Sequence, residues 1–350
     1  MTLVQRQTNT QPIIVDDYYK SMFLQYSQRD FSGGKTEELA VTFDKTIKKY
    51  QEIDIPTPYE SIVHYPILVD ILENLFLIGI KHDVFPSNFP KPLIGSADLA
   101  QIGAYAQTAY NTIVIDRGLF FFFSNMSRII AELVMTYEGS DYIIKASVLT
   151  VEELVKRIQS NHSIVRDFAE IVAAYLKYGT VLPFSQHNAL SSSTKAQFHE
   201  ELTYAAMRFV VAHEMMHILY QHQDSSPQNE SDADVMATQL CGLFVQDMAK
   251  ESQLYWAPVY VTSVLDLLQQ ADTLLGFKTT THPEKRAELT HYIATRMKVG
   301  GHALGMAQAV RRIMFLLWAL TKDIVLDLAK NERITSPQML KDVIAAIPFR

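Results

Sequence analysis

The spacing of apolar residues is the feature that most constrains how this chain can fold. Through most of its 350 residues, apolar side chains recur three and four positions apart, which is the pattern of an amphipathic α-helix. The segments with this spacing are 37–50, 67–80, 150–178, 197–222, 228–250, 258–276 and 303–329. Strand-like sequence is confined to residues 112–115 and, more weakly, 103–108. The sequence therefore predicts a predominantly helical α+β fold with a small β-sheet.

The overall charge and the absence of long apolar runs exclude several classes of protein. The chain has 31 basic and 38 acidic residues, and a net charge of -7 gives no attraction for a nucleic-acid backbone. The most apolar stretch, residues 118–126, is far shorter than the roughly 20 residues that a membrane-spanning helix needs. We therefore expect no nucleic-acid partner and no membrane span.

The single cysteine and the N-terminal sequence bear on where the protein is located. Cys241 has no second cysteine with which to form an intrachain disulfide, which suits a reducing compartment. Residues 1–20 lack the basic segment and long apolar run of a secretory signal. The predicted location is the cytoplasm.

Residues 213–217 read His-Glu-Met-Met-His, inside a segment from 197 to 222 that contains no proline or glycine. On a helix, positions four apart differ by about 40°, so His213 and His217 project from one face and can share a tetrahedral cation. Glu214 lies beside them. From there it could hold and deprotonate a metal-bound water, as the glutamate of an H-E-x-x-H metallopeptidase does.

Glu230 is the predicted third ligand. It opens the next helical pattern after a short polar loop, in which Ser226 and Pro227 resemble a helix cap and a first-turn proline. Two antiparallel helices would then face each other across the metal, with the fourth coordination position left for water. Asp234, one turn further on, could accept the free N–H of a ligating histidine. The alternative is that these acidic residues merely complement the dipole of the helix.

A three-histidine metal site of the metzincin type does not fit this sequence. That motif would require a glycine at the position of Tyr220 and a histidine at the position of Gln223. His222 is one residue out of register and is expected in solvent near the helix end. Cys241 is interpreted as a small core residue.

These motifs resemble those of the gluzincin zinc peptidases, especially the HtpX and CAAX-processing type, which combine H-E-x-x-H with E-x-x-A-D. The matching positions are His213, Glu214, His217, Glu230, Ala233, Asp234 and Ala237. Residues 111–119 resemble the strand and Gly-Leu turn that precede the active-site helix in that family. Residues 281–286, with His282 and Arg286, resemble its downstream T-H-P-x-x-R element.

The resemblance implies a zincin-like peptidase core with one Zn²⁺ per chain and a protein or peptide substrate. It implies that His213, His217 and Glu230 bind the metal and that Glu214 is the catalytic base. Asp234 and Arg286 would then support the site. Either His282 or a tyrosine of the segment before the catalytic helix could stabilise the oxyanion.

The sequence differs from the HtpX type in two features. The membrane helices of the HtpX type are absent, and the 13-residue spacing from His217 to Glu230 resembles soluble ImmA/IrrE-type or phage-exclusion peptidases.

A group of three prolines between residues 85 and 92 marks a break in the helical pattern. The predicted regions are an N-terminal helical region at 1–92, the peptidase core at 93–298 with a helical insertion at about 123–194, and a C-terminal helical region at 299–350.

The alternative function is a non-catalytic module in which zinc stabilises a protein-interaction surface. A structural zinc site needs no base beside the metal and usually has four protein ligands. The presence of Glu214 next to His213 therefore favours the enzyme.

Overall fold

The computed structural model describes residues 64–97, 102–138, 141–144, 149–179, 193–224, 226–248, 256–276 and 301–347. Contacts within the chain divide it into two units, Met1–Pro66 and Ile67–Arg350. Nearly all of the described residues belong to the second unit. The three-region division proposed from the sequence remains a prediction, and the expected helix at 37–50 lies outside the described residues.

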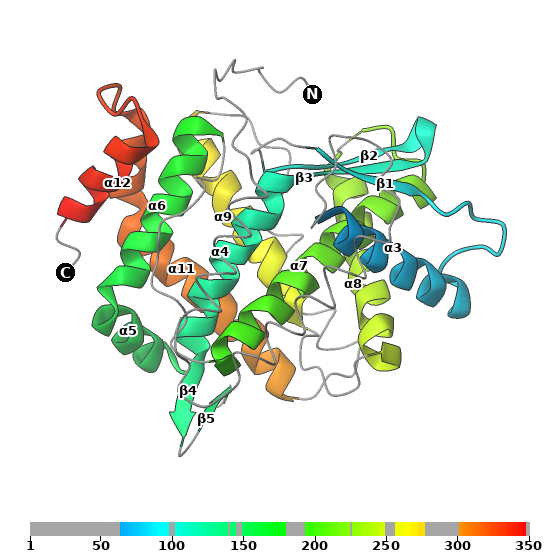
Figure 1. Cartoon of the computed structure of the whole chain (residues 1–350), viewed down its shortest axis with the longest axis horizontal. Helices are drawn as coiled ribbons and strands as arrows, with labels where there is room; N and C mark the ends of the chain where they lie inside the picture. The colour runs from blue at the N-terminus through cyan, green and yellow to red at the C-terminus, as the bar shows by residue number, and fades with distance from the viewer. Residues whose placement is uncertain are drawn as a thin grey trace. The chain divides into compact units, whose positions relative to one another are not determined.

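Helices dominate the described part of the chain, as predicted (Figure 1). They are α3 (His64–Lys81), α4 (Arg117–Val134), α5 (Val151–Ser160), α6 (His162–Tyr178), α7 (Ser193–Leu219), α8 (Pro227–Met248), α9 (Ala257–Leu274), α11 (Gly301–Lys330) and α12 (Pro337–Ala346). A short 3-10 helix, Thr108–Tyr110, lies between two strands. The expectation of one helical segment at 150–178 is corrected to two helices, because the chain leaves the helical conformation at Asn161 (φ -128, ψ 70).

A three-stranded sheet supplies the β part of the fold. It consists of β1 (Leu93–Ala97), β2 (Ala104–Gln107) and β3 (Thr112–Asp116) in the order β1-β3-β2. The central strand β3 runs parallel to β1 and antiparallel to β2. The sequence predicted β3 and β2 but not β1. A separate two-stranded sheet pairs β4 (Met135–Glu138) with β5 (Asp141–Ile144).

Helix α4 begins directly after β3, and this corrects one detail of the expected strand and turn. Gly118 and Leu119 lie inside the first turn of α4 and do not form a separate turn. The phenylalanine-rich stretch that follows is interior: Phe122 and Phe123 are fully buried. Tyr260 of α9 donates a hydrogen bond to the carbonyl oxygen of Phe123 at 3.1 Å and fixes the two helices against each other.

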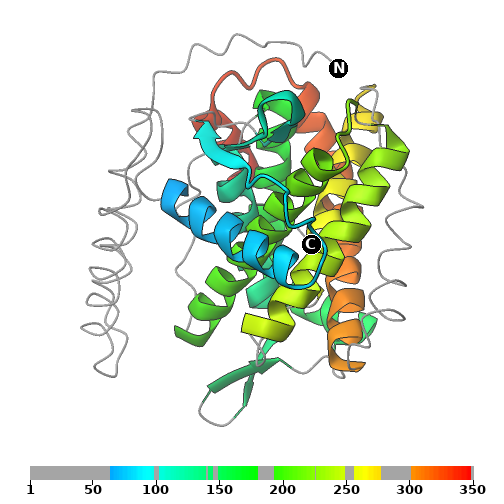
Figure 2. The same cartoon turned by 90° about the vertical axis from the view of Figure 1, so that its right-hand side faces the viewer.

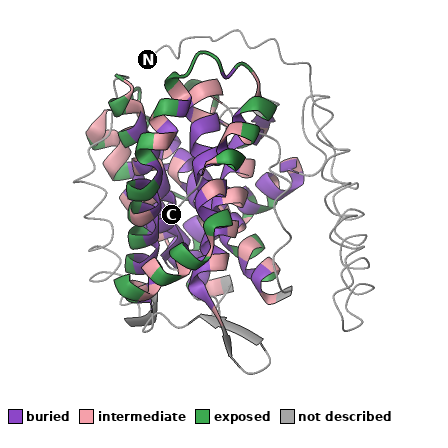
Figure 3. Cartoon of the chain, turned by 90° about the vertical axis from the view of Figure 1, so that its left-hand side faces the viewer, coloured by how far each residue is buried: buried purple, intermediate pink, exposed green. Residues whose placement is uncertain are grey.

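Helix α7 is central to the packing around the site. It contacts α4, α8 and α9, and in Figure 1 it lies between α4 and α8. Helix α11 packs on α6 and α9. Figure 3 shows the buried residues on the inward faces of these helices and the exposed residues on their outer faces. Cys241 is buried, as expected of a small core residue.

Helix α3 is joined to the far end of α8, and Figure 2 shows the two helices beside each other. Lys81 donates to Oδ2 of Asp247 at 2.6 Å, and Nε2 of His82 lies 2.8 Å from the same oxygen.

No helix in the described ranges is both long enough and apolar enough to cross a membrane.

Candidate metal centre

The candidate site lies where α7 ends and α8 begins. Helix α7 ends in a Schellman motif: Gln221 adopts a positive φ of 53°, its N–H bonds to the carbonyl of Ile218 at 3.2 Å, and the N–H of His222 bonds to the carbonyl of His217 at 3.0 Å. The short loop that follows brings the chain back to start α8. This connection places the last turn of α7 against the first turn of α8.

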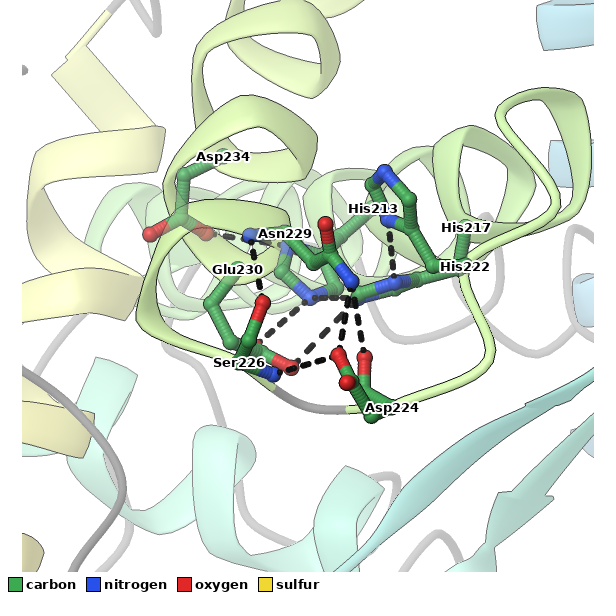
Figure 4. A network of polar contacts seen from close by, with 8 residues as sticks. All are labelled: His213, His217, His222, Asp224, Ser226, Asn229, Glu230 and Asp234. Atoms are coloured by element: carbon green, nitrogen blue, oxygen red, sulfur yellow. Dashed lines mark hydrogen bonds and ion pairs between the residues drawn. The ribbon is translucent and has the colours of Figure 1, made fainter.

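Helix α8 begins with the cap that the sequence predicted. Oγ of Ser226 accepts a hydrogen bond from the N–H of Asn229 at 3.3 Å, and Pro227 occupies the first helical position. Asp224 fastens the loop, because its Oδ1 accepts from Nδ2 of Asn229 at 2.8 Å and from the N–H of Ser226 at 3.1 Å. Figure 4 shows these contacts between Asp224, Ser226 and Asn229. The loop therefore fixes the position of Glu230.

Three side chains predicted as metal ligands converge in the structure (Figure 4). The Nε2 atoms of His213 and His217 lie 3.0 Å apart. The carboxylate of Glu230 lies 3.4 Å from Nε2 of His213 and 3.7 Å from Nε2 of His217. Among the residues that the structure describes, these three form the group whose ligand atoms, all within 4.8 Å of one another, could hold a metal ion.

The chemistry and spacing of these donors fit a divalent zinc ion. Zinc binds imidazole nitrogen and carboxylate oxygen at about 2.0–2.2 Å, so two ligand atoms at neighbouring tetrahedral corners lie about 3.3 Å apart. The three separations of 3.0, 3.4 and 3.7 Å bracket that value. The side chains are only 13%, 10% and 19% exposed for His213, His217 and Glu230 respectively. A cation held here would be largely shielded from solvent.

Asp234 holds the remaining nitrogen of His213. Its Oδ1 lies 2.9 Å from Nδ1 of His213, which is the arrangement predicted from the sequence. Burial acts to lower the pKa of His213, but the carboxylates of Asp234 and Glu230 outweigh it and raise the pKa to about 10. Burial and the charge of His213 lower the pKa of His217 to about 4. The carboxylates thus favour positive charge at His213, whereas His217 favours the neutral form, in which an imidazole nitrogen can bind a metal.

His222 contacts His217, the other candidate histidine ligand, which the sequence did not predict. Its Nδ1 lies 2.9 Å from Nδ1 of His217, and the two rings meet edge to face. The expectation that His222 points into solvent is therefore wrong. The signal available in the sequence was its position five residues after His217, where a Schellman motif returns the chain toward the last helical turn.

Glu214 points toward β2 and is 8% exposed. Burial, together with the charges of Glu230 and Asp234, raises its pKa to about 7, although the charge of His213 and a hydrogen bond from the backbone of Ala106 act in the opposite direction. A carboxyl group that titrates near neutral pH can both accept and donate a proton. The pKa of Glu214 lies in this range.

A second buried carboxyl group lies at the end of β3. Asp116 is fully buried, and burial raises its pKa to about 6, with a hydrogen bond from Tyr105 acting to lower it. Gly103 leaves the room for this pair, since a Cβ atom at that position would lie 2.6 Å from Oδ2 of Asp116 and closer still to the Tyr105 hydroxyl. The charge of Glu214 also raises the pKa of Tyr105, after burial and Asp116. Nothing in the sequence pointed to this pair.

Two predicted residues cannot be placed. His282 and Arg286 lie outside the described residues. Their predicted roles in stabilising the oxyanion and supporting the site stay predictions.

Comparison with known families identifies a peptidase family. The family model for peptidase U49 matches residues 120–307, which is 188 of the 350 residues. The chain belongs to the peptidase U49 family. The match in this U49 peptidase spans α7 and α8 and so includes His213, Glu214, His217 and Glu230. Neither the comparison with curated proteins nor that with solved structures found a match.

A peptidase hydrolyses peptide bonds, so the substrate of this U49 peptidase is a protein or a peptide. The three converging side chains and Glu214 come from two helices within the matched region. This places the candidate metal centre in the part of the chain that defines the family.

Proposed function

We propose that this protein is a zinc-dependent endopeptidase in which His213, His217 and Glu230 hold Zn²⁺ and Glu214 is the general base. The observation that carries the proposal is the convergence of two Nε2 atoms and one carboxylate at 3.0–3.7 Å. Glu214 lies on the same helix next to the first of these histidines. This combination is the metal set and base of a gluzincin peptidase, the group that the sequence motifs resemble.

Glu214 would move the protons of the reaction. When bound, zinc would polarise the scissile carbonyl and lower the pKa of water. Glu214 would accept a proton from the attacking water and deliver it to the leaving amine. Its burial and its pKa of about 7 support both steps, because the group changes protonation state readily near neutral pH.

The exposed edge of the sheet offers a place for the substrate. Among the strands that the structure describes, β2 is at the edge of its sheet and pairs with β3 alone. An extended peptide could add to this edge as a further strand, with its backbone forming the hydrogen bonds. The contact between α7 and β2 supports this arrangement, because α7 carries Glu214.

The oxyanion of the tetrahedral intermediate needs a hydrogen-bond donor. His282, or a tyrosine between residues 123 and 194, could supply it, and Arg286 could support the wall of the site. These assignments rest on the resemblance to the HtpX, CAAX-processing and ImmA/IrrE-type peptidases. Membership of a peptidase family favours an enzyme over a zinc-stabilised interaction module.

Elemental analysis and peptide hydrolysis test this proposal together. We expect about one zinc per purified chain, and loss of both zinc and hydrolysis in the His213→Ala, His217→Ala double variant. A His162→Ala variant is the control, since His162 is exposed at the start of α6, away from the ligand group. Undiminished zinc in the double variant would place the metal elsewhere and overturn the proposal.

A further inference from the structure

We infer that His222 is a positioning residue of the metal centre: it holds Nδ1 of His217 so that Nε2 of His217 faces the metal. The inference rests on the proposed function and adds to it a residue outside the H-E-x-x-H and E-x-x-A-D motifs. It follows from the contact of 2.9 Å between the two Nδ1 atoms and from the backbone that creates this contact.

The end of α7 explains why His222 reaches His217. In a Schellman motif, the second residue after the helix bonds back to the carbonyl three residues inside the helix end. Here those two residues are His222 and His217, joined by a backbone hydrogen bond of 3.0 Å, and Gln221 provides the positive φ of 53° that the turn requires. A side-chain contact between these two positions frequently accompanies the motif. In this protein both positions are histidine.

The ring of His222 is held on two sides. It lies edge to face against His217, with ring centroids 5.0 Å apart and an interplanar angle of 75°. It stacks on Tyr220, with centroids 5.7 Å apart and an angle of 23°. Two ring contacts and a fixed backbone leave the imidazole little freedom to turn away. The contact between the Nδ1 atoms is therefore a property of the fold at this helix end.

The chemistry of imidazole sets the direction of the hydrogen bond. A neutral histidine has one N–H and one bare nitrogen, and only the bare nitrogen can bind a metal. Nε2 of His217 is the atom that faces Nε2 of His213 and the carboxylate of Glu230. The proton of a ligating His217 must then be on Nδ1, and this N–H donates to Nδ1 of His222.

The two ligating histidines thus have equivalent supports. Asp234 lies 2.9 Å from Nδ1 of His213, and His222 lies 2.9 Å from Nδ1 of His217. Metal-bound histidines generally donate this second N–H to a carboxylate, a carbonyl or water, and loss of the acceptor typically costs about 10- to 100-fold in metal affinity or activity. For His217, the acceptor of this N–H is the neutral imidazole of His222. His222 is not itself a ligand, because its contact is on the side of His217 opposite to Nε2.

Three variants separate this role from a merely structural one. His222→Phe keeps an aromatic ring against Tyr220 but removes the acceptor. His222→Asn restores an acceptor, because its side-chain oxygen occupies roughly the position of the imidazole Nδ1. Gln221→Gly is the control for the turn, since glycine adopts a φ of 53° without strain.

The measurements are the zinc dissociation constant, obtained by competition of the apoprotein with a chromophoric chelator, and the visible absorption of the Co²⁺-loaded protein. We expect His222→Phe to weaken zinc binding about 10-fold or more and to alter the Co²⁺ spectrum. His222→Asn should return both toward the wild-type values, and Gln221→Gly should leave both unchanged. Rescue by asparagine is the result that a purely structural role of the ring would not produce.

Wild-type affinity in His222→Phe would overturn the inference and leave the proposed function standing. The same holds if His222→Asn binds zinc as weakly as His222→Phe. Failure of the wild-type protein itself to bind zinc would overturn the proposed function as well. The two failures are therefore distinguishable in one series of titrations.

Discussion

Oδ1 of Asp234 lies 2.9 Å from Nδ1 of His213, across the interface between α8 and α7. The contact connects His213, a proposed metal ligand on one helix, to a residue one turn beyond Glu230, the proposed third ligand, on the other. It brings the carboxylate beside the ring nitrogen of His213 that does not face the site. The same contact raises the pKa of His213 against the effect of burial, which shows how strongly the carboxylate interacts with the ring.

Asp234→Asn should weaken zinc binding by about 10- to 100-fold, because the amide holds the His213 ring less firmly and carries no charge. Asp232→Asn is a matched control on the same helix: Asp232 is exposed and accepts a hydrogen bond from Gln228 at 2.8 Å. Zinc titration of the two apoproteins measures the difference. Equal affinities in both variants would show that the contact with His213 does not support the metal.

A second prediction concerns the cap of α8, because this cap positions Glu230. The carbonyl oxygen of Ser226 accepts from the N–H of Glu230 at 3.0 Å, and its Oγ caps the helix. Ser226→Ala should lower the free energy of unfolding by about 1 kcal/mol and should also weaken zinc binding.

Ser336→Ala is the matched control for this cap. Oγ of Ser336 accepts from the N–H of Met339 at 3.2 Å at the start of α12, so its loss should cost a similar free energy without affecting zinc. Denaturant unfolding of the metal-free proteins and zinc titration give the two quantities. If zinc affinity were unchanged in Ser226→Ala despite the lost stability, the cap would not be what places Glu230.

His199 should make stability depend on pH below neutrality. Its Nε2 lies 2.9 Å from the carbonyl oxygen of Ser124 between α7 and α4, and burial lowers its pKa from 6.5 to about 4. Between these two values the unfolded chain binds a proton at His199 and the folded chain does not. The free energy of unfolding therefore falls as pH decreases through this window, by about 3 kcal/mol from this group.

His199→Gln should flatten this part of the pH dependence, because glutamine does not titrate but can still donate to Ser124. The control is His162→Gln at an exposed position of α6. Denaturant unfolding at a series of pH values measures the slope. A slope in His199→Gln as steep as in the wild type would mean that other groups cause the acid sensitivity.

The sequence predicted the candidate ligands because their geometry is local. Residues four apart on a helix share a face, so His213 and His217 could be paired before any fold was known. Glu230 could be predicted as the third ligand because a cap residue and a proline mark the start of the next helix. Both predictions needed only helical periodicity and the short loop between the two helices.

The features that were missed either depend on distant parts of the chain or lie at turns that no glycine or proline marks. Strand β1 (Leu93–Ala97) is short, contains glycine and serine, and acquires its conformation by pairing with β3. His222 was assigned to solvent because no glycine marks the turn at Gln221, whose positive φ returns the chain to His217. The break at Asn161 likewise has no proline or glycine that could have been recognised.

Glu230 and Glu214 have different roles in the proposed site, with Glu230 holding the metal and Glu214 moving the proton. Zinc content and peptide hydrolysis, measured on the same preparations of Glu214→Gln and Glu230→Gln, test these roles most directly. Glu201→Gln, on the exposed face of α7, is the control. Glu214→Gln should keep about one zinc per chain and lose hydrolysis by about 10²-fold or more. Glu230→Gln should lose zinc, since two histidines remain as its protein ligands. A Glu214→Gln protein without zinc, beside a Glu230→Gln protein that keeps zinc and activity, would contradict the account.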